Sequence, residues 1–216
     1  MNINEVLNVL NFRHACKEFD PNRKINTDDL ETIIEGGRLA ASSVGIEPWH
    51  FIVVENTEFK NELSTTYFSN PKHIANCSAF VILLTRNANE IKPDSKYIDY
   101  ILKDINELRG DAYNMHKEFI KSVIGRFKND TEIQAYANEQ TYIALSSMML
   151  SAAMLGIDSC AIGGINKEAV TKILVEKGLL DTTKFQVTLG CALGYRVNEI
   201  TPKKRQPLNK VATFIK

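Results

Sequence analysis

Hydrophobic positions recur every three or four residues in several segments of the chain, which is the spacing of one face of a helix. This spacing predicts helices over 3–11, 27–41 and 57–68. Residues 133–155 form the longest such segment, and Gly156 directly after it can end a helix. We therefore expect the 133–155 helix to be the central helix of the fold.

Other segments have the composition or the period of strands. Residues 51–54, 79–84 and 158–162 are short apolar segments bounded by polar ones. Apolar and other residues alternate over 184–193, a period of two that predicts a half-buried strand. Because strands occur early and late with mostly helix between them, we expect an α+β fold rather than regular strand–helix alternation.

Domain organisation follows from what separates these segments. No internal repeat, low-complexity tract or linker rich in Pro and Gly divides the 216 residues, so we expect one domain over 1–216. Residues 94–139 are more polar and still keep helical spacing over much of their length. We expect a helical excursion there that covers the core and the active site.

Composition excludes several classes of function. The chain has 26 basic and 26 acidic side chains, so no positive field favours nucleic acid. The four cysteines are widely spaced, which predicts free thiols in a reducing compartment. The N-terminus has no signal-peptide pattern, and the longest apolar segment is shorter than the roughly 20 residues of a membrane span. We expect a cytoplasmic protein that binds neither nucleic acid nor membrane.

Familiar catalytic and metal-binding motifs are absent. The sequence has no G-x-G-x-x-G, P-loop, H-E-x-x-H or G-x-S-x-G, and its histidines show no metal-ligand spacing. Positive charge instead occurs at both ends of the chain, at Arg13 and Lys17 and again at 203–205. The two clusters could clamp a phosphate together, or each could be a solvated surface. Gly163 and Gly164 could let a main-chain N–H approach a flat ligand, or could form a simple turn.

Four segments resemble motifs of the nitroreductase family of FMN enzymes, in the order and spacing of that family. Residues 11–19 (NFRHACKEF) resemble its R-x-S-x-R/K-x-F opening, and 40–51 (AASSVGIEPWHF) resemble its A-P-S-S-x-N-x-Q-P-W-x-F segment. Residues 155–165 (LGIDSCAIGGI) are similar to its G-x-x-S/T-C-P-I-G-G-F turn, and 193–196 (LGYR) with 202–208 (PKKRQPL) resemble its G-Y-P and K-x-R-x-P-L close. The resemblance covers the whole chain except 94–139.

The resemblance implies a fold and an activity. The fold would be a mixed β-sheet surrounded by helices, with a long central helix, in an interlocked homodimer whose active sites lie at the interface. The activity would be FMN-dependent reduction of nitroaromatics, quinones or similar electron-poor acceptors by NADH or NADPH, through a ping-pong hydride mechanism. Because the cofactor carries the redox chemistry, no catalytic side chain and no metal are implied.

The resemblance also implies which residues bind FMN. Arg13, His14 and Lys17 would contact the phosphate, the ribityl chain and the pyrimidine edge. Ala15 would contribute main chain, Asn70 would contact the isoalloxazine, and Gly163 and Gly164 would present an N–H to flavin N5. The remaining implied ligands are Lys203 and Arg205 at the phosphate, with Ser42, Ser43 and Gly45 reaching the flavin of the partner subunit.

Several positions depart from the family pattern. Gly45 replaces the usual Asn and Glu47 the usual Gln, which alters the hydrogen-bonding groups available to the flavin rim. Ala15 replaces a Ser and loses a hydroxyl. Arg196 replaces the Pro of G-Y-P, where we expect a change of local stiffness only.

Other functions stay open at this point. With the flavin retained, the chain could be a flavin-binding or sensory protein without turnover, or could catalyse another reaction of the same fold, such as flavin reduction or dehalogenation. Without flavin, it could be a structural helical dimer. The aromatic side chains in the excursion either line a substrate slot or pack as ordinary helix faces; they are Tyr97, Tyr100, Tyr113 and Phe119.

Overall fold

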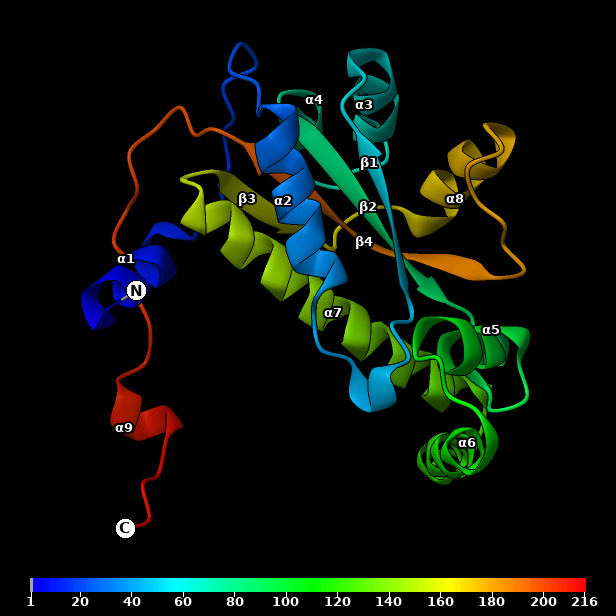
Figure 1. Cartoon of the computed structure of the whole chain (residues 1–216). Coiled ribbons are helices and arrows are strands. Elements are labelled where there is room, and N and C mark those ends of the chain that lie inside the picture. Colours follow the sequence, from blue (N-terminus) through cyan, green and yellow to red (C-terminus); the bar gives the residue numbers. More distant parts are fainter. Residues whose placement is uncertain (1) are drawn as a thin grey trace.

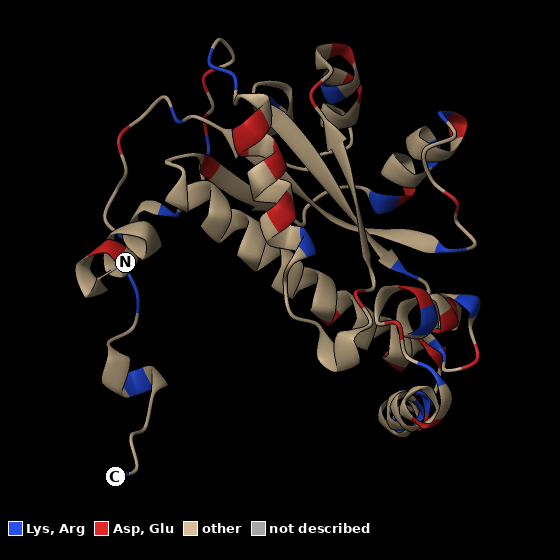
Figure 2. Cartoon of the chain, in the orientation of Figure 1, with Lys and Arg blue, Asp and Glu red and all other residues tan. Residues whose placement is uncertain are grey.

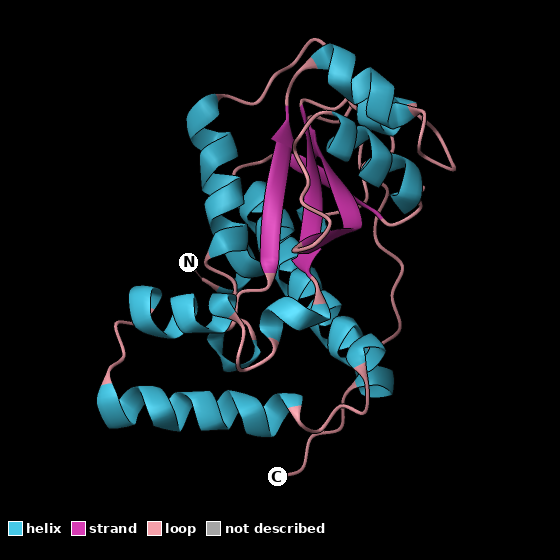
Figure 3. Cartoon of the chain, turned by 90° about the vertical axis from the view of Figure 1, so that its right-hand side faces the viewer, coloured by secondary structure: helices cyan, strands magenta, loops and turns pink. Residues whose placement is uncertain are grey.

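The computed structural model describes residues 2–216, and its centre is one antiparallel sheet (Figure 3). The strand order is β1-β2-β4-β3, so β2 and β4 are the inner strands. The predicted α+β class is confirmed. The strands are β1 (Trp49–Val54), β2 (Ala79–Arg86), β3 (Asp158–Ile162) and β4 (Phe185–Gly194).

Helices cover both faces of this sheet (Figure 1). The central helix predicted over 133–155 is present as α7 (Asp130–Met154), which starts earlier because the Asn129 side chain caps the amide of Glu132. The other helical elements are α1 (Ile3–Phe12), α2 (Thr27–Arg38), η1 (Ser43–Gly45), α3 (Thr57–Ser64), α4 (Lys72–Ala75), η2 (Ala88–Ile91), α5 (Lys96–Tyr100), η3 (Ile101–Ile105), α6 (Gly110–Ile124), α8 (Lys167–Glu176) and α9 (Leu208–Val211).

Two apolar layers enclose the sheet. On one face, Val81 and Leu83 of β2 pack with α2 and α7, which contribute Ile33 and Met148. On the other face, Phe80 and its neighbours pack with α3 and α8. The prediction of a half-buried β4 is therefore wrong, because helices cover both of its faces and residues 187–194 are all buried.

The predicted helical excursion forms a third cluster beside the sheet, around Ile98, Ile101 and Leu102. It comprises α5, a turn of π-helix over 101–105, and α6, which extends away from the sheet in Figure 3. Met115 and Phe119 of α6 have the spacing of one helix face, but both side chains are exposed, so this face does not pack against the rest of the chain. Among residues 2–216, no helix is both long and apolar enough to cross a membrane.

Helix α1 and the segment that leads from β4 to α9 lie side by side outside this body (Figure 1). No residue of α1 is buried, although its apolar face has the predicted helical spacing. After β4 the chain passes α1, where Lys203 Nζ donates a hydrogen bond to the Leu10 oxygen, and then continues through α9. The sheet and the central helix are thus complete before residue 200.

Candidate functional site

The segment after α1 is attached to the sheet by main-chain pairing. Ala15 forms a parallel bridge with Ser159 of β3, and the Cys16 amide donates to the Ser159 oxygen at 3.1 Å. Phe19 forms an antiparallel bridge with Arg196 just beyond β4. Because Cys16 and Phe19 are buried, this extended segment leaves Ala15 and Lys17 exposed at its surface.

Lys17 lies beside a pocket of about 550 Å³ at this edge of the sheet. Four predicted site residues line the pocket, namely His14, Ala15, Lys17 and Asn70. Three of them come from the N-terminal segment and one from the turn before α4. The structure therefore brings together residues that lie more than fifty positions apart in the sequence.

The cysteines near this pocket are unsuited to nucleophilic chemistry. All four cysteines of the chain are free and buried. Burial raises the pKa of Cys16 to about 11 and also raises that of Cys160, although the Lys17 ammonium lies 3.8 Å from the Cys160 sulfur. Among residues 2–216, no cluster of three or more His, Cys, Asp or Glu side chains is placed to hold a metal ion.

Three cations from the two ends of the chain form a basic cluster, which we define as Arg13, Lys203 and Arg205. Figure 2 shows basic residues on the segment after α1 and on the segment that leads to α9. Burial, Arg13 and Arg205 lower the pKa of Lys203, so the three charges are close enough to repel one another. No carboxylate within residues 2–216 forms an ion pair with any of them. Such a cluster favours an anion.

The Gly163–Gly164 turn follows β3. A Cβ atom added at Gly163 would meet nothing within 4 Å, and neither glycine has a left-handed backbone. The Gly164 oxygen accepts a hydrogen bond from the Phe68 amide at 3.0 Å, which attaches the turn to the segment that precedes Asn70. Nothing in the chain itself requires glycine at 163, so the open space above its main chain suits a flat ligand.

Arg196 does more than the expected change of stiffness, and that expectation is wrong. Its Nε donates to Asp158 Oδ2 at 2.9 Å, and its Nη2 lies 2.8 Å from Asp158 Oδ1. The Asp158 carboxylate is buried, and it also lies 3.6 Å from His14 Nδ1. The guanidinium covers the Phe12 ring at 4.1 Å. This buried ion pair therefore fixes the segment that carries His14 against β3 and β4.

His73 is a pocket residue that sequence reasoning missed. It lines the same pocket as Lys17, with only 5% of its surface exposed, and its Nδ1 lies 3.4 Å from the Tyr67 hydroxyl. Burial and the Lys17 charge lower the pKa of His73. His73 lies three residues after Asn70, and side chains one helical turn apart lie on the same side. This spacing from a predicted site residue could have identified His73.

Ser42, Ser43 and Gly45 lie away from this pocket within one chain. Ser43 is held from α7, where the Gln140 side chain accepts its amide at 2.9 Å. From Gln140 to the end of α7, near β3, the helix rises about 21 Å at about 1.5 Å per residue. None of the three residues lines the pocket of His14 and Lys17 in the same chain. Their predicted contact with a partner subunit's flavin stays a prediction.

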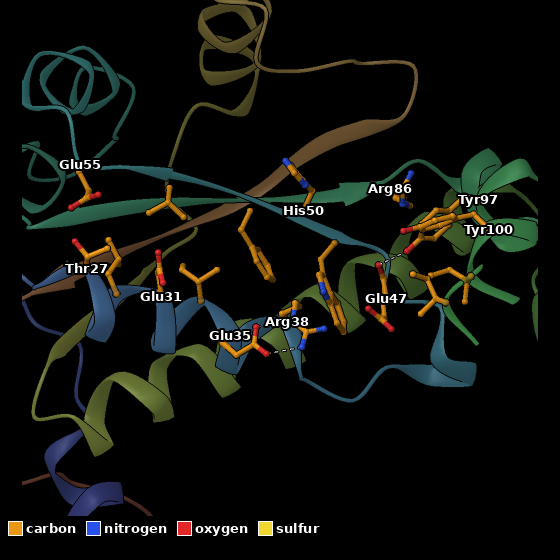
Figure 4. A pocket seen from close by; sticks show the side chains of 17 residues that line it. Thr27, Glu31, Glu35, Arg38, Glu47, His50, Glu55, Arg86, Tyr97 and Tyr100 are labelled. Carbon is orange, nitrogen blue, oxygen red and sulfur yellow. Dashed lines mark hydrogen bonds and ion pairs between the residues drawn. The ribbon is translucent and has the colours of Figure 1, made fainter. Parts of the chain in front are cut away.

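A cavity of about 760 Å³ lies beside the loop after Gly45 and not beside Lys17 (Figure 4). It lies between α2, the free edge of β1 and α5. Its walls combine aromatic rings with the carboxylates Glu31, Glu35, Glu47 and Glu55 and with the guanidinium groups of Arg38 and Arg86. The Arg38 guanidinium is already paired with Glu35, so this cavity offers a phosphate fewer unpaired cations than the basic cluster does.

Comparison with known proteins identifies the family of the chain. The chain matches the family model described as Nitroreductase family over residues 10–195. It is 40% identical over 215 residues to YfkO of Bacillus subtilis, provisionally named an NAD(P)H nitroreductase, with 98% of this chain and 97% of YfkO covered.

Solved structures share the fold. A Staphylococcus epidermidis protein, provisionally described as an NAD(P)H:FMN oxidoreductase, matches with a TM-score of 0.80 and 25% identity over 100% of this chain and 98% of its own. An Exiguobacterium sibiricum protein solved in complex with FMN, provisionally described as a nitroreductase, has a TM-score of 0.75 and 21% identity, with 97% and 96% covered. From its sequence and its fold, the chain belongs to the nitroreductase family of oxidoreductases.

Proposed function

We propose that the chain is an FMN-dependent oxidoreductase that uses NADH or NADPH to reduce nitroaromatics, quinones or similar electron-poor acceptors. The basic cluster carries this proposal, because Arg13, Lys203 and Arg205 converge without a carboxylate partner. The FMN named for the Exiguobacterium protein supports the choice of cofactor. The names of YfkO and of the Staphylococcus epidermidis protein support NAD(P)H as the reductant.

The basic cluster, the pocket and the Gly163–Gly164 turn each have a role in this proposal. The basic cluster binds the FMN phosphate, and Arg guanidinium groups suit phosphate oxygens because they donate two parallel hydrogen bonds. His14 and Asn70 line the pocket toward the ribityl chain and the ring, while Ala15, Gly163 and Gly164 offer main chain rather than bulk.

When bound, FMN supplies the redox chemistry, taking hydride from NADH or NADPH and passing electrons to the acceptor in a ping-pong sequence. Lys17 contributes a fixed positive charge at the pocket wall, where it stabilises negative charge at the pyrimidine edge. The chain needs no general acid or nucleophile for this chemistry, in accord with the protonated, buried thiols of Cys16 and Cys160.

We further propose that the active form is a homodimer, with residues 1–216 acting as one domain in the cytoplasm. Apolar side chains left exposed on α1, on α7 and along the C-terminal tail support an interface between two copies. They are Ile3, Leu7, Leu10, Tyr142, Ile143, Leu208, Val211, Phe214 and Ile215. Light scattering is expected to give twice the chain mass of 24.3 kDa, and a monomer would contradict the proposal.

An anaerobic visible spectrum tests the proposed function. We expect the purified protein, or the protein reconstituted with FMN, to show flavin absorption that bleaches when NADH or NADPH is added. Addition of a nitroaromatic or a quinone should then restore the absorption. A bound flavin that neither pyridine nucleotide bleaches would contradict the reductase and favour a binding or sensory role. A protein that cannot retain FMN would contradict the whole proposal.

A further inference from the structure

The loop that joins α2 to β1 has a backbone that its own sequence does not favour. Val44, Gly45 and Glu47 have left-handed φ values of 51°, 66° and 41°. Glycine adopts this conformation readily, but a β-branched valine and a glutamate do so rarely. Contacts from outside the loop must therefore stabilise its shape.

The main outside contact comes from the excursion. Tyr97 of α5 has 9% of its surface exposed, and its hydroxyl lies 2.9 Å from the Ile46 oxygen and 2.7 Å from the Glu47 oxygen. Figure 4 shows this hydroxyl directed at the loop, with the dashed line reaching Glu47. One phenolic hydrogen is thus shared between two consecutive carbonyl groups, at the point where the backbone turns from left-handed to extended.

Tyr97 itself is held firmly. The Arg86 guanidinium lies 3.4 Å from the centroid of its ring, and Arg86 is in turn paired with Glu90 at 3.2 Å. Burial raises the pKa of Tyr97 to about 12, so its hydroxyl stays a donor throughout the physiological range. The neighbouring Ile46 is fully buried in the same cluster as Tyr97, so its side chain attaches the loop to the excursion.

We propose that Tyr97 is a positioning residue for the flavin site, because its hydroxyl holds loop 42–47 in the shape that presents Ser42, Ser43 and Gly45 to the partner subunit's flavin. The inference rests on the proposed function, in which this loop reaches the partner. It gives the excursion a second task, since Tyr97 then supports the loop as well as lining the cavity between α2, β1 and α5.

Two tyrosines three positions apart provide a matched experiment. Tyr97→Phe keeps the ring, its burial and the contact with Arg86, and removes only the hydroxyl. Tyr100→Phe makes the same change at a side chain that is 48% exposed, and its hydroxyl donates no hydrogen bond within residues 2–216. Hydrogen exchange on the full-length protein measures how often the loop opens. The amides to follow donate hydrogen bonds to oxygen atoms of the loop; they belong to Gly45, Ile46, Glu47 and Trp49.

For Tyr97→Phe we expect exchange at these amides to rise about three- to tenfold, the effect of one lost hydrogen bond. FMN should dissociate faster by a similar factor, and the absorption bands of the bound flavin should shift. Tyr100→Phe should match the unmodified protein in all three readouts. Because a purely structural role would not move the bands of flavin that is still bound, the spectral shift separates positioning from general destabilisation.

Two results would overturn the inference, and a third separates it from the proposed function. Loop exchange equal to that of the unmodified protein would show that the hydroxyl does not hold the loop. Faster exchange with unchanged flavin release and spectrum would show that the loop does not serve the flavin, while the proposed function would stand. If the unmodified chain retains no FMN, the proposed function fails first and this inference fails with it.

Discussion

Main-chain pairing holds the segment that carries Arg13, His14 and Lys17, whereas side chains hold loop 42–47. We term the segment with Arg13, His14 and Lys17 the basic half of the site. It bridges to β3 through Ala15 and to the end of β4 through Phe19. We term loop 42–47 the loop half; its left-handed backbone at Val44 and Glu47 depends on hydrogen bonds from the Tyr97 hydroxyl and to the Gln140 side chain.

This difference suggests a division of labour between the two halves. Main-chain pairing is insensitive to most substitutions, so the basic half can keep one geometry while its sequence varies, provided that the Arg196–Asp158 ion pair is kept. Side-chain support of a strained loop changes with a single residue. The departures from the family pattern at Gly45 and Glu47 lie in the loop half, where they can alter the flavin rim without disturbing the sheet.

The largest expected effect is the loss of the buried ion pair in the basic half. Arg196→Ala should lower the free energy of unfolding by about 3 kcal/mol or more, because it leaves the buried Asp158 carboxylate without its cation. Urea denaturation measures this change. Arg38→Ala is the control, since its ion pair with Glu35 is exposed on α2 and should leave stability nearly unchanged. Equal losses of unfolding free energy in the two variants would show that burial of the Asp158 carboxylate does not make its ion pair more important than an exposed one.

The basic cluster should come next in size. Arg13→Ala and Arg205→Ala should each weaken FMN binding by about 1.5 to 3 kcal/mol, the contribution of a charge-assisted hydrogen bond. Fluorescence titration with FMN measures this change. Lys204→Ala removes an adjacent charge that we do not assign to the phosphate, and should have a smaller effect. Unchanged affinity in both arginine variants would place the phosphate elsewhere.

The smallest effect concerns the pH dependence of stability. The pKa of His73 lies below its unfolded value near 6.5, because burial and Lys17 disfavour the charged ring. The unfolded chain therefore takes up this proton first, so stability is full above pH 6.5 and declines as the pH falls through and below that value. His73→Gln should make this decline shallower.

Urea denaturation at a series of pH values tests this prediction. The lowered pKa of His50, caused by burial and Arg86, should leave part of the decline in place. His116→Gln, on the exposed part of α6, is the matched control and should retain the full decline. A His73→Gln variant that follows the control would show that His73 does not resist protonation in the folded protein.

Periodicity predicted most of the elements, because local patterns determine them. The helices at α1, α2 and α7 and the strands at β1, β2 and β3 lie where the spacing placed them, within a few residues. The predicted helix over 57–68 ends at Ser64, because Tyr67 pairs instead with Ile165, a contact that no local pattern encodes. Burial of β4 on both faces likewise depends on distant helices.

The resemblance to the family named the residues of the candidate site, and the structure adds how they are held. His14, Ala15, Lys17 and Asn70 line one pocket, and Arg13, Lys203 and Arg205 form one cluster. The role of Arg196 could not be predicted, since it comes from Asp158, which lies far away in the sequence. His73 had only its spacing from Asn70 as a local signal, and its contact with the Lys17 charge is likewise long-range. The part of Ser42, Ser43 and Gly45 in flavin binding stays a prediction.

The position of the basic cluster has a consequence for biosynthesis. When Gly194 leaves the ribosomal exit tunnel, every strand of the sheet has been synthesised. Lys203 and Arg205 follow only later in the sequence. A prematurely terminated chain could therefore fold its sheet and still lack two of the three clustered cations. Under the proposed function, retention of the yellow cofactor would report that translation had passed Arg205.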